Sequence, residues 1–185
     1  MPFSAESAVA LRRHPDSRSG AVRAIEARAR RAAGEALAVT FSIRGDIARI
    51  RVPEPSPPQR ADDLWKHTCC EVFVARPGAA AYHEFNLSPA GQWAAYAFSA
   101  YRERAELDAA ALAPGIAVLR SATLIELSAT LRLGMISREH VGTSLALGLS
   151  AVIEESDGAL SYWALEHPPG RPDFHHTAAF ALTIA

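Results

Sequence analysis

Apolar and polar residues alternate along much of this chain, with the period of two that is typical of half-buried β-strands. Residues 37–44 and 145–153 show the pattern most clearly, and turn signals such as Pro77-Gly78 and Asp157-Gly158 separate the alternating segments. A series of about ten short strands joined by turns predicts a sandwich or a barrel. We expect one all-β domain over residues 1–185. It should be a two-sheet antiparallel β-sandwich of the immunoglobulin or jelly-roll kind, with a few short helical turns.

In three segments, alternation alone does not predict the secondary structure. The Ala and Arg content of residues 22–31 favours a helix on propensity alone, but the strands that follow lead us to predict a strand. An apolar pattern resumes at residues 47–52 after Gly45-Asp46, so we predict a hairpin with the preceding strand. Residues 101–113 are the best helical candidate. The predicted strands are 22–31, 37–44, 47–52, 68–75, 82–88, 93–99, 118–133 (one bent strand or two), 145–153, 162–166 and 180–184.

Composition limits the classes of function. The chain has 185 residues, of which 49% are hydrophobic and 21% are charged, and this is ordinary for a globular domain. A formal net charge of -1 gives no strong field towards nucleic acid or an anionic membrane, so neither is an expected partner. No window approaches the roughly 20 apolar residues that span a bilayer. A protein partner is neither indicated nor excluded.

The start of the chain and the two cysteines are relevant to the cellular compartment of the protein. Residues 1–15 lack a basic end followed by an apolar run, so we expect no export signal and a cytoplasmic protein. Cys69 and Cys70 are adjacent, and neighbouring strand residues point to opposite faces, so a bond between them would be strained. We predict two free thiols. A cysteine–histidine nucleophile pair is the alternative, but cysteines in mid-strand usually serve packing.

Alternation places three polar side chains on one face of neighbouring strands. Glu71 lies on this face of one strand, and Glu84 and Asn86 lie on it in the next, with Glu126 of a later strand as a further candidate. Aromatic residues share the same face. Carboxylates and amides hydrogen-bond to sugar hydroxyls, and an aromatic ring covers the apolar face of a sugar, so this pattern suits a sugar site. The alternative is that these residues form the solvent face of an antiparallel sheet.

Tryptophans are the second signal for a binding site. Trp65 stands where a proline-rich loop enters a strand, with Lys66 and His67 beside it, and Trp163 stands near a strand end. Loops at the margin of a sandwich build pockets on a rigid frame. We therefore predict Trp65 and Trp163 as ligand platforms, with Trp93 as a further candidate from mid-strand. The alternative is a core position, which is more common for a tryptophan in a sandwich.

A late loop adds Asp173, His175 and His176, and we expect it to close over the site. Its side chains, together with other histidines of the chain, raise the alternative of a metal site. The spacing of these residues matches no diagnostic metal motif, so we expect them to cap or to hydrogen-bond. The other ligand candidates considered for a metal are His67, His83, Glu84 and His167.

Three segments resemble bacterial DOMON-like proteins, a group that is similar to the family-9 carbohydrate-binding modules. They are residues 63–73 (DLWKHTCCEVF), 82–96 (YHEFNLSPAGQWAAY) and 171–176 (RPDFHH). The resemblance implies a sandwich of two antiparallel sheets with a ligand site on one face. Members of the wider group bind sugars or haem. In the sugar-binding modules tryptophans grip the sugar, a role that Trp65 and Trp163 match by position.

We predict a module that binds a small ligand, most simply a sugar or a sugar-like metabolite. One alternative is a glycoside-acting enzyme, in which Glu71 and Glu84 would be the paired carboxylates. Another is a haem-binding domain, for which Met135 is the one methionine beyond the start residue. No cofactor is assigned, and haem or a divalent metal stays open behind the sugar. The predicted ligand-binding residues are Trp65, Lys66, His67, Glu71, Glu84, Asn86, Trp93, Trp163, Asp173 and His175, and no residue is assigned as catalytic.

Overall fold

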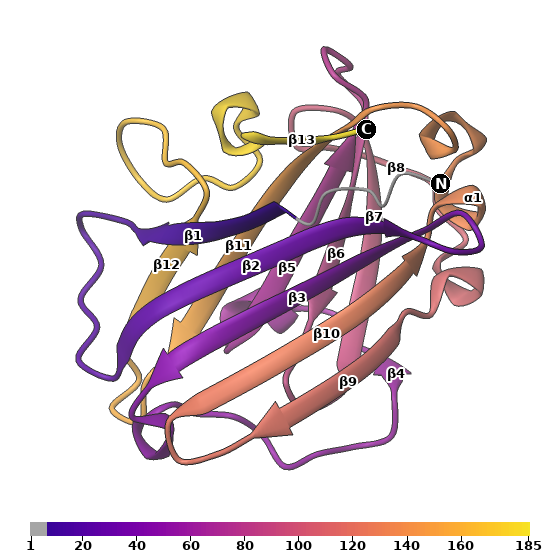
Figure 1. Cartoon of the computed structure of the whole chain (residues 1–185). Coiled ribbons are helices and arrows are strands. Elements are labelled where there is room, and N and C mark those ends of the chain that lie inside the picture. Colours follow the sequence, from indigo (N-terminus) through magenta and orange to yellow (C-terminus); the bar gives the residue numbers. More distant parts are fainter. Residues whose placement is uncertain (1–6) are drawn as a thin grey trace.

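Most of the described chain is β-strand, as the alternation predicts. The computed structural model describes residues 7–185, whose strands join by hydrogen bonds into one curled path (Figure 1). Residues 1–6, which begin the segment searched for an export signal, lie outside the described residues. Along the path the strand order is β4-β7-β6-β5-β11-β12-β1-β2-β3-β10-β9, with β8 beside β7 and β13 beside β11.

The path folds over into two packed layers, which confirms the predicted β-sandwich. Neighbouring strands are antiparallel, apart from a two-residue parallel contact between β4 and β7. Sheet A contains β1 (Ser7–Arg13), β2 (Val22–Ala32), β3 (Ala36–Gly45), β9 (Gly115–Arg120) and β10 (Leu124–Arg132). Sheet B contains β4 (Gln59–Arg60), β5 (Cys69–Ala75), β6 (Tyr82–Leu87), β7 (Gln92–Ala100), β8 (Glu103–Ala105), β11 (Leu145–Glu154), β12 (Leu160–Ala164) and β13 (Leu182–Ile184). β1 joins the two sheets, since its first part pairs with β2 and its last two residues pair with β12.

The core lies between the sheets and takes every second residue of the strands on both sides. In sheet A, Phe41 pairs with Leu127 and Ile43 pairs with Ile125, and all four side chains are fully buried. Sheet B contributes alternate residues of its strands, such as Val72. Burying one side chain of this size contributes roughly 1.5–3 kcal/mol. A shift of one residue in register would expose this set, so the apolar alternation specifies the pairing.

Sheet B is also covered on its outer face. The residues that alternate with the core residues form a second buried cluster, to which the loops add Leu64 and Phe174. The predicted alternative, a plain solvent face, is therefore wrong for this sheet. The strand residues of this outer cluster are Cys69, Phe73, Ala75, Tyr82, Ala94, Tyr96, Phe98, Val152 and Ala164.

Residues 47–52 do not form a strand, and the predicted hairpin with residues 37–44 is wrong. β3 pairs with β2 and β10 instead, and the chain makes a 3-10 turn, η1 (Ile47–Arg49). Ile47 and Ile50 are three residues apart, so one such turn directs both side chains into the core, where both are buried.

Residues 101–113 do not form the predicted helix. Glu103–Ala105 pair with β7 as β8, and a single 3-10 turn, η3 (Ala109–Leu112), follows. The edge of β7 offers unpaired backbone groups, and this tertiary pairing outweighs the helical propensity of Glu, Arg, Ala and Leu. Arg102 makes the turn between β7 and β8 with a φ of 57°, a left-handed conformation that is uncommon for a residue other than glycine.

The remaining helical turns have three or four residues each, as expected for a sandwich. They are η2 (Leu64–Lys66), α1 (Leu133–Ile136), η4 (Arg138–His140) and η5 (Thr177–Ala179). Within residues 7–185, none of the helices has the length and apolar character to cross a membrane. The segment 118–133, predicted as one bent strand or two, contains parts of two strands, β9 and β10.

Both cysteines are free and fully buried on opposite faces of β5. Burial raises the pKa of each thiol, with a further contribution from the nearby charge of Glu71. We therefore expect no reaction with a thiol reagent in the folded protein and two reactive thiols after unfolding without a reductant. A spectrophotometric thiol titration in buffer and in denaturant checks this. A folded protein with fast-reacting thiols would contradict the buried placement of Cys69 and Cys70.

Candidate functional site

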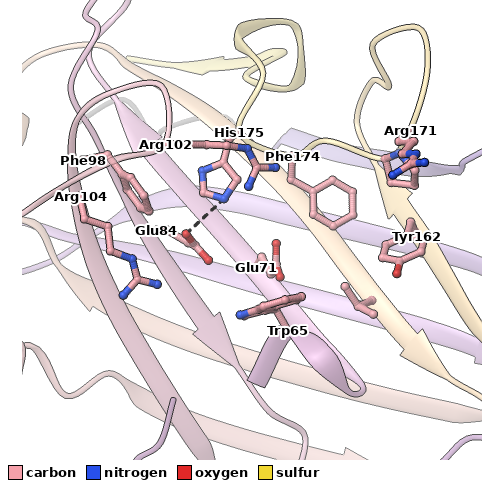
Figure 2. Close-up of a pocket in the computed structure, with 12 residues that line it drawn as sticks. Trp65, Glu71, Glu84, Phe98, Arg102, Arg104, Tyr162, Arg171, Phe174 and His175 are labelled. Carbon is pink, nitrogen blue, oxygen red and sulfur yellow. Dashed lines mark ion pairs between the residues drawn. The ribbon is translucent and has the colours of Figure 1, made fainter. Parts of the chain in front are cut away.

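A pocket of about 460 Å³ opens on the outer face of sheet B. Strands β5 and β6 supply its floor, and loops on both sides supply its walls (Figure 2). Two carboxylates stand at its centre, and its margin is aromatic and basic. We call this space the central pocket. The residues used below are the acids Glu71 and Glu84, the aromatics Trp65, Phe98, Tyr162 and Phe174, the arginines Arg102, Arg104 and Arg171, and His175.

Glu71 and Glu84 share one sheet face, as the alternation predicts. Glu71 pairs with Asn86 across β5 and β6, so Glu84 is its diagonal neighbour two residues along. The side chains are deeply set, with 3% of Glu71 and 5% of Glu84 exposed. Glu126 does not join them, because it lies on β10 in sheet A, where it accepts a hydrogen bond from Ser42 (3.4 Å).

The environment of the two acids favours their neutral forms. Burial raises the pKa of Glu71 well above its ordinary value, and the charge of Glu84 raises it further. Burial also raises the pKa of Glu84, although the hydrogen bond from Asn86 acts in the opposite direction. Glu71 accepts one hydrogen bond, from the Ser150 hydroxyl (3.3 Å). The pair therefore holds protons more strongly than exposed carboxyl groups do, and a carboxyl group that keeps its proton can both donate to and accept from a hydroxyl.

A chain of polar contacts fixes the position of Glu84. The Asn86 amide donates to its Oε1 atom (2.8 Å), and Asn86 itself is fully buried. His175 Nε2 lies 3.7 Å from Glu84 Oε2, the contact dashed in Figure 2. The Tyr82 hydroxyl accepts from the backbone N–H of Arg102 (3.1 Å) and shares a hydrogen bond with His175 Nδ1 (2.8 Å). Burial lowers the pKa of His175 to about 4, so its ring is neutral at pH 7.

Trp65 is the tryptophan that the structure brings to the central pocket. It lies on η2 and is 46% exposed, and its ring stands beside Glu71 in Figure 2. Asp63, which precedes this turn, has a φ of 63°, a conformation that an aspartate tolerates. The predicted neighbours of Trp65 do not line the pocket, although Lys66 Nζ lies 5.5 Å from the centre of the Trp65 ring. Lys66 Nζ pairs with Asp63 (2.8 Å), and His67 Nδ1 bonds to Glu154 (2.8 Å), so neither lines the pocket.

The predictions for Trp163 and Trp93 are wrong, because both side chains belong to the core between the sheets. Trp163 pairs with Ala151 of β11, whose side chain is also in this core, and its Nε1 donates to the Ser161 hydroxyl (3.0 Å). The next residue back, Tyr162, pairs with Val152 and faces the central pocket with it. Tyr162 therefore occupies the side of the pocket that was predicted for Trp163.

The loop from residue 165 to 176 closes one side of the pocket, as expected. It supplies Phe174, His175 and Arg171 to the lining. Asp173 lies behind the lining, where it binds Arg102 (2.8 Å) and accepts a hydrogen bond from Tyr101 (2.6 Å). The arginines and Phe98 were not predicted. Nothing in the alternation distinguished them from the many other arginines and core aromatics of the chain.

The histidines considered for a metal site are separated in the structure. His83 contacts His140 (3.2 Å), and His167 contacts the backbone oxygen of Arg12 (2.8 Å). Among residues 7–185, no three His, Cys, Asp or Glu side chains gather in a way that could hold a metal ion. Met135, the methionine considered for haem, is exposed on α1 and does not line the central pocket.

Comparison with known proteins gives likeness in structure alone. No protein-family model and no curated protein matches the sequence. A candidate carbohydrate-binding protein from Bacteroides uniformis superimposes with a TM-score of 0.68 at 14% identity, covering 94% of this chain and 83% of that one. A family-9 carbohydrate-binding module from Caldicellulosiruptor kristjanssonii, solved with cellotriose, gives a TM-score of 0.58 at 9% identity, covering 89% of this chain and 75% of that one. The chain therefore has the β-sandwich fold of these carbohydrate-binding proteins.

Proposed function

We propose that this protein is a binding module for a sugar or a sugar-like metabolite, which it takes up in the central pocket. One observation carries the proposal. Two buried carboxyl groups, Glu71 and Glu84, form the floor of a pocket whose mouth holds the exposed ring of Trp65. Buried polar groups are costly to leave without partners, so a floor of this kind favours a ligand rich in hydroxyl groups.

The pocket provides both kinds of contact that a sugar ring requires. Glu71 and Glu84 hydrogen-bond to hydroxyls on the floor, while Trp65 and Tyr162 offer apolar surface to the C–H groups of the ring. Its volume of about 460 Å³ lies in the range of roughly 300–1,000 Å³ that is usual for small-ligand sites. The motif resemblance to DOMON-like proteins and the fold shared with carbohydrate-binding modules support the same ligand class.

Replacing Trp65 by alanine tests the proposal. We expect Trp65→Ala to weaken binding by about 1–3 kcal/mol, by analogy with the stacking of a base on an aromatic ring. Its melting temperature should stay close to that of the wild type, since the ring is 46% exposed. Isothermal titration calorimetry with a panel of neutral and acidic monosaccharides, together with a thermal melt, measures both quantities.

Leu119→Ala is the control for this experiment, because Leu119 is 68% exposed on β9 of sheet A and does not line the central pocket. This variant should bind as the wild type does. If no sugar of the panel binds the wild type, or if Trp65→Ala binds as tightly as the wild type, the proposed site is wrong.

Glycoside hydrolysis is the second candidate function, and the pairing of Glu71 with Glu84 favours it. The two side chains come from diagonal neighbours on β5 and β6 and line the same pocket, and glycoside hydrolysis requires two carboxyl groups that face one glycosidic bond. A raised pKa is also what a general acid needs. Turnover of nitrophenyl glycosides that Glu84→Gln abolishes would establish an enzyme, whereas saturable binding without turnover supports the binding module.

A further inference from the structure

Three arginines stand around the central pocket, and their arrangement bears on the charge of the ligand. Arg102 and Arg104 come from the turn after β7 and from β8, on the side of Phe98 and Glu84. Arg171 comes from the loop on the opposite side, near Phe174 (Figure 2). A ligand in the pocket would therefore have guanidinium groups on two sides.

The arginines of the β8 side are held in place by other residues. Arg102 Nη2 binds Asp173 Oδ1 at 2.8 Å, and the left-handed backbone of Arg102 makes the turn that brings it to the pocket. The Arg104 guanidinium lies 4.1 Å from the centre of the Tyr96 ring, a cation–π contact that leaves its N–H groups free. The Tyr96 hydroxyl in turn donates to Asp62 (2.8 Å). The positions of Arg102 and Arg104 therefore do not depend on a ligand.

Two of the three arginines around the pocket have no carboxylate partner among the described residues. Arg102 has a carboxylate partner, but within residues 7–185 neither Arg104 nor Arg171 forms an ion pair. Burial raises the pKa of both Glu71 and Glu84, which reduces the negative charge on the floor, although Arg102 and Arg104 lower the pKa of Glu84 in part. Unpaired guanidinium groups beside a partly desolvated pocket are the usual means of binding a carboxylate, phosphate or sulfate group.

The basic margin also continues beyond the pocket. Arg102 and Arg171 both border a second cavity of about 460 Å³, which Pro168, Pro169 and His176 also line. Asp173 is the acidic side chain of this lining and is already bound to Arg102. A charged substituent that projects from a ring in the central pocket towards this second cavity would therefore lie near Arg102 and Arg171.

We infer that the ligand of the central pocket is an acidic sugar, whose anionic group binds Arg104 on one side of the pocket or Arg171 on the other while its ring lies over Glu71 and Glu84. This inference rests on the proposed function and specifies the ligand class. The shared chemistry is a negatively charged oxygen group on a pyranose. It comes from a carboxylate, as in a uronic acid, or from a phosphate or sulfate ester.

The experiment compares matched pairs of sugars by calorimetry at pH 7. Glucose, galactose, mannose and N-acetylglucosamine are each titrated beside the uronic acid, the phosphate and the sulfate of the same ring. An acidic member should bind at least about tenfold more tightly than its neutral parent, the gain expected of one or two hydrogen bonds to a charged group. The member that binds best distinguishes a carboxylate from an ester. The preference should fall at about 1 M NaCl, where charge interactions are screened beyond about 3 Å.

The variants are Arg104→Gln and Arg171→Gln, each of which removes one charge. The variant at the arginine that binds the anion should bring the affinity for the acidic sugar to within about threefold of that for the neutral one, while the other variant keeps the preference. If neither variant lowers the preference, the inference is wrong. Arg120→Gln is the matched control, since Arg120 is an exposed arginine of β9 outside the pocket, and it should keep the preference. A thermal melt of each variant shows that it is folded, and Arg104→Lys, which retains a charge, should keep part of the preference.

The other outcomes separate this inference from the function on which it rests. If a neutral sugar binds as tightly as its acidic partner and Trp65→Ala abolishes its binding, the acidic ligand is wrong and the sugar site stands. If no sugar of either charge binds, both are wrong. If inorganic phosphate or sulfate binds as tightly as the sugar ester, the arginines bind an anion without a sugar, and the inference is also wrong.

Discussion

Trp163→Ala is expected to lower the free energy of unfolding by about 3–5 kcal/mol, because it removes a large side chain from the core between the sheets. The ring is 6% exposed and packs among residues of both sheets. For a domain of this size the loss corresponds to a fall in melting temperature of about 6–20 °C. At temperatures where the variant is folded, its affinity for the ligand of the central pocket should stay near that of the wild type.

The matched control is Trp65→Ala, the same substitution at an exposed position. It should change stability by no more than about 0.5 kcal/mol and weaken binding instead. Chemical denaturation measures the stability of both variants and calorimetry measures their ligand affinity. We expect Trp163→Ala to lose stability and Trp65→Ala to lose affinity. A stable Trp163→Ala protein that no longer binds would show that Trp163 contacts the ligand, as the sequence suggested, and would contradict its core placement.

Glu71→Gln is expected to stabilise the protein at pH 8 while it weakens ligand binding. Glu71 is buried beside Glu84 and has one hydrogen bond to satisfy its charge, so ionising it costs free energy. We estimate a gain of about 1–3 kcal/mol, the usual cost of a buried polar group that lacks partners. The amide keeps the acceptor oxygen for Ser150 and removes the charge. Lost affinity for added stability is a common exchange at binding sites.

The pH dependence gives this prediction a definite sign. The folded-state pKa of Glu71 is raised, so its contribution to stability is fully present below about pH 4.5 and is lost as the pH rises through the raised value. Glu71→Gln should therefore show a smaller loss of stability between pH 5 and about pH 9 than the wild type. His175 acts in the other direction. Its lowered pKa gives stability that is present above about pH 6.5 and is lost as the pH falls towards about 4.

Melting temperatures measured across this range for the wild type and for Glu71→Gln check the sign. Glu126→Gln serves as the control, because Glu126 is a partly exposed acid on the outer face of sheet A. Its stability should follow the wild-type curve. A Glu71→Gln protein that is less stable than the wild type at pH 8 would mean that the carboxylate is better satisfied than the contacts of Glu71 indicate.

The strands and their faces were largely predictable, because alternation is a local signal. The face shared by Glu71, Glu84 and Asn86 follows from counting residues along β5 and β6. The failures lie where tertiary contacts outweigh local preference. The predicted helix at residues 101–113 is replaced by pairing with the edge of β7, a contact that residue composition does not show.

The structure places Tyr162 in the central pocket where Trp163 was predicted, and this shows how far the site could be predicted from the sequence. Neighbouring strand residues face opposite sides, so the choice between them depends on register with β11 and, through it, with β5. The Asp157-Gly158 turn lies between β11 and β12 and bears on this register, in which Val152 pairs with Tyr162. The prediction of Trp163 rests on the chemistry of tryptophan and not on this register. The arginines of the pocket carried no local signal, since the turn at Arg102 exists only in the folded chain.

The separation of the two buried clusters on sheet B has a consequence for how such a protein could evolve. Along β5 and β6, the residues of the core and those of the central pocket alternate, so each strand carries two independent sets of positions. Exchanging a floor residue such as Glu84 does not change the volume that the sheets must fill around Val72 and Phe85. Substitutions at the pocket positions, which are every second residue of these strands, can therefore change the ligand preference among related chains while the sandwich fold is kept.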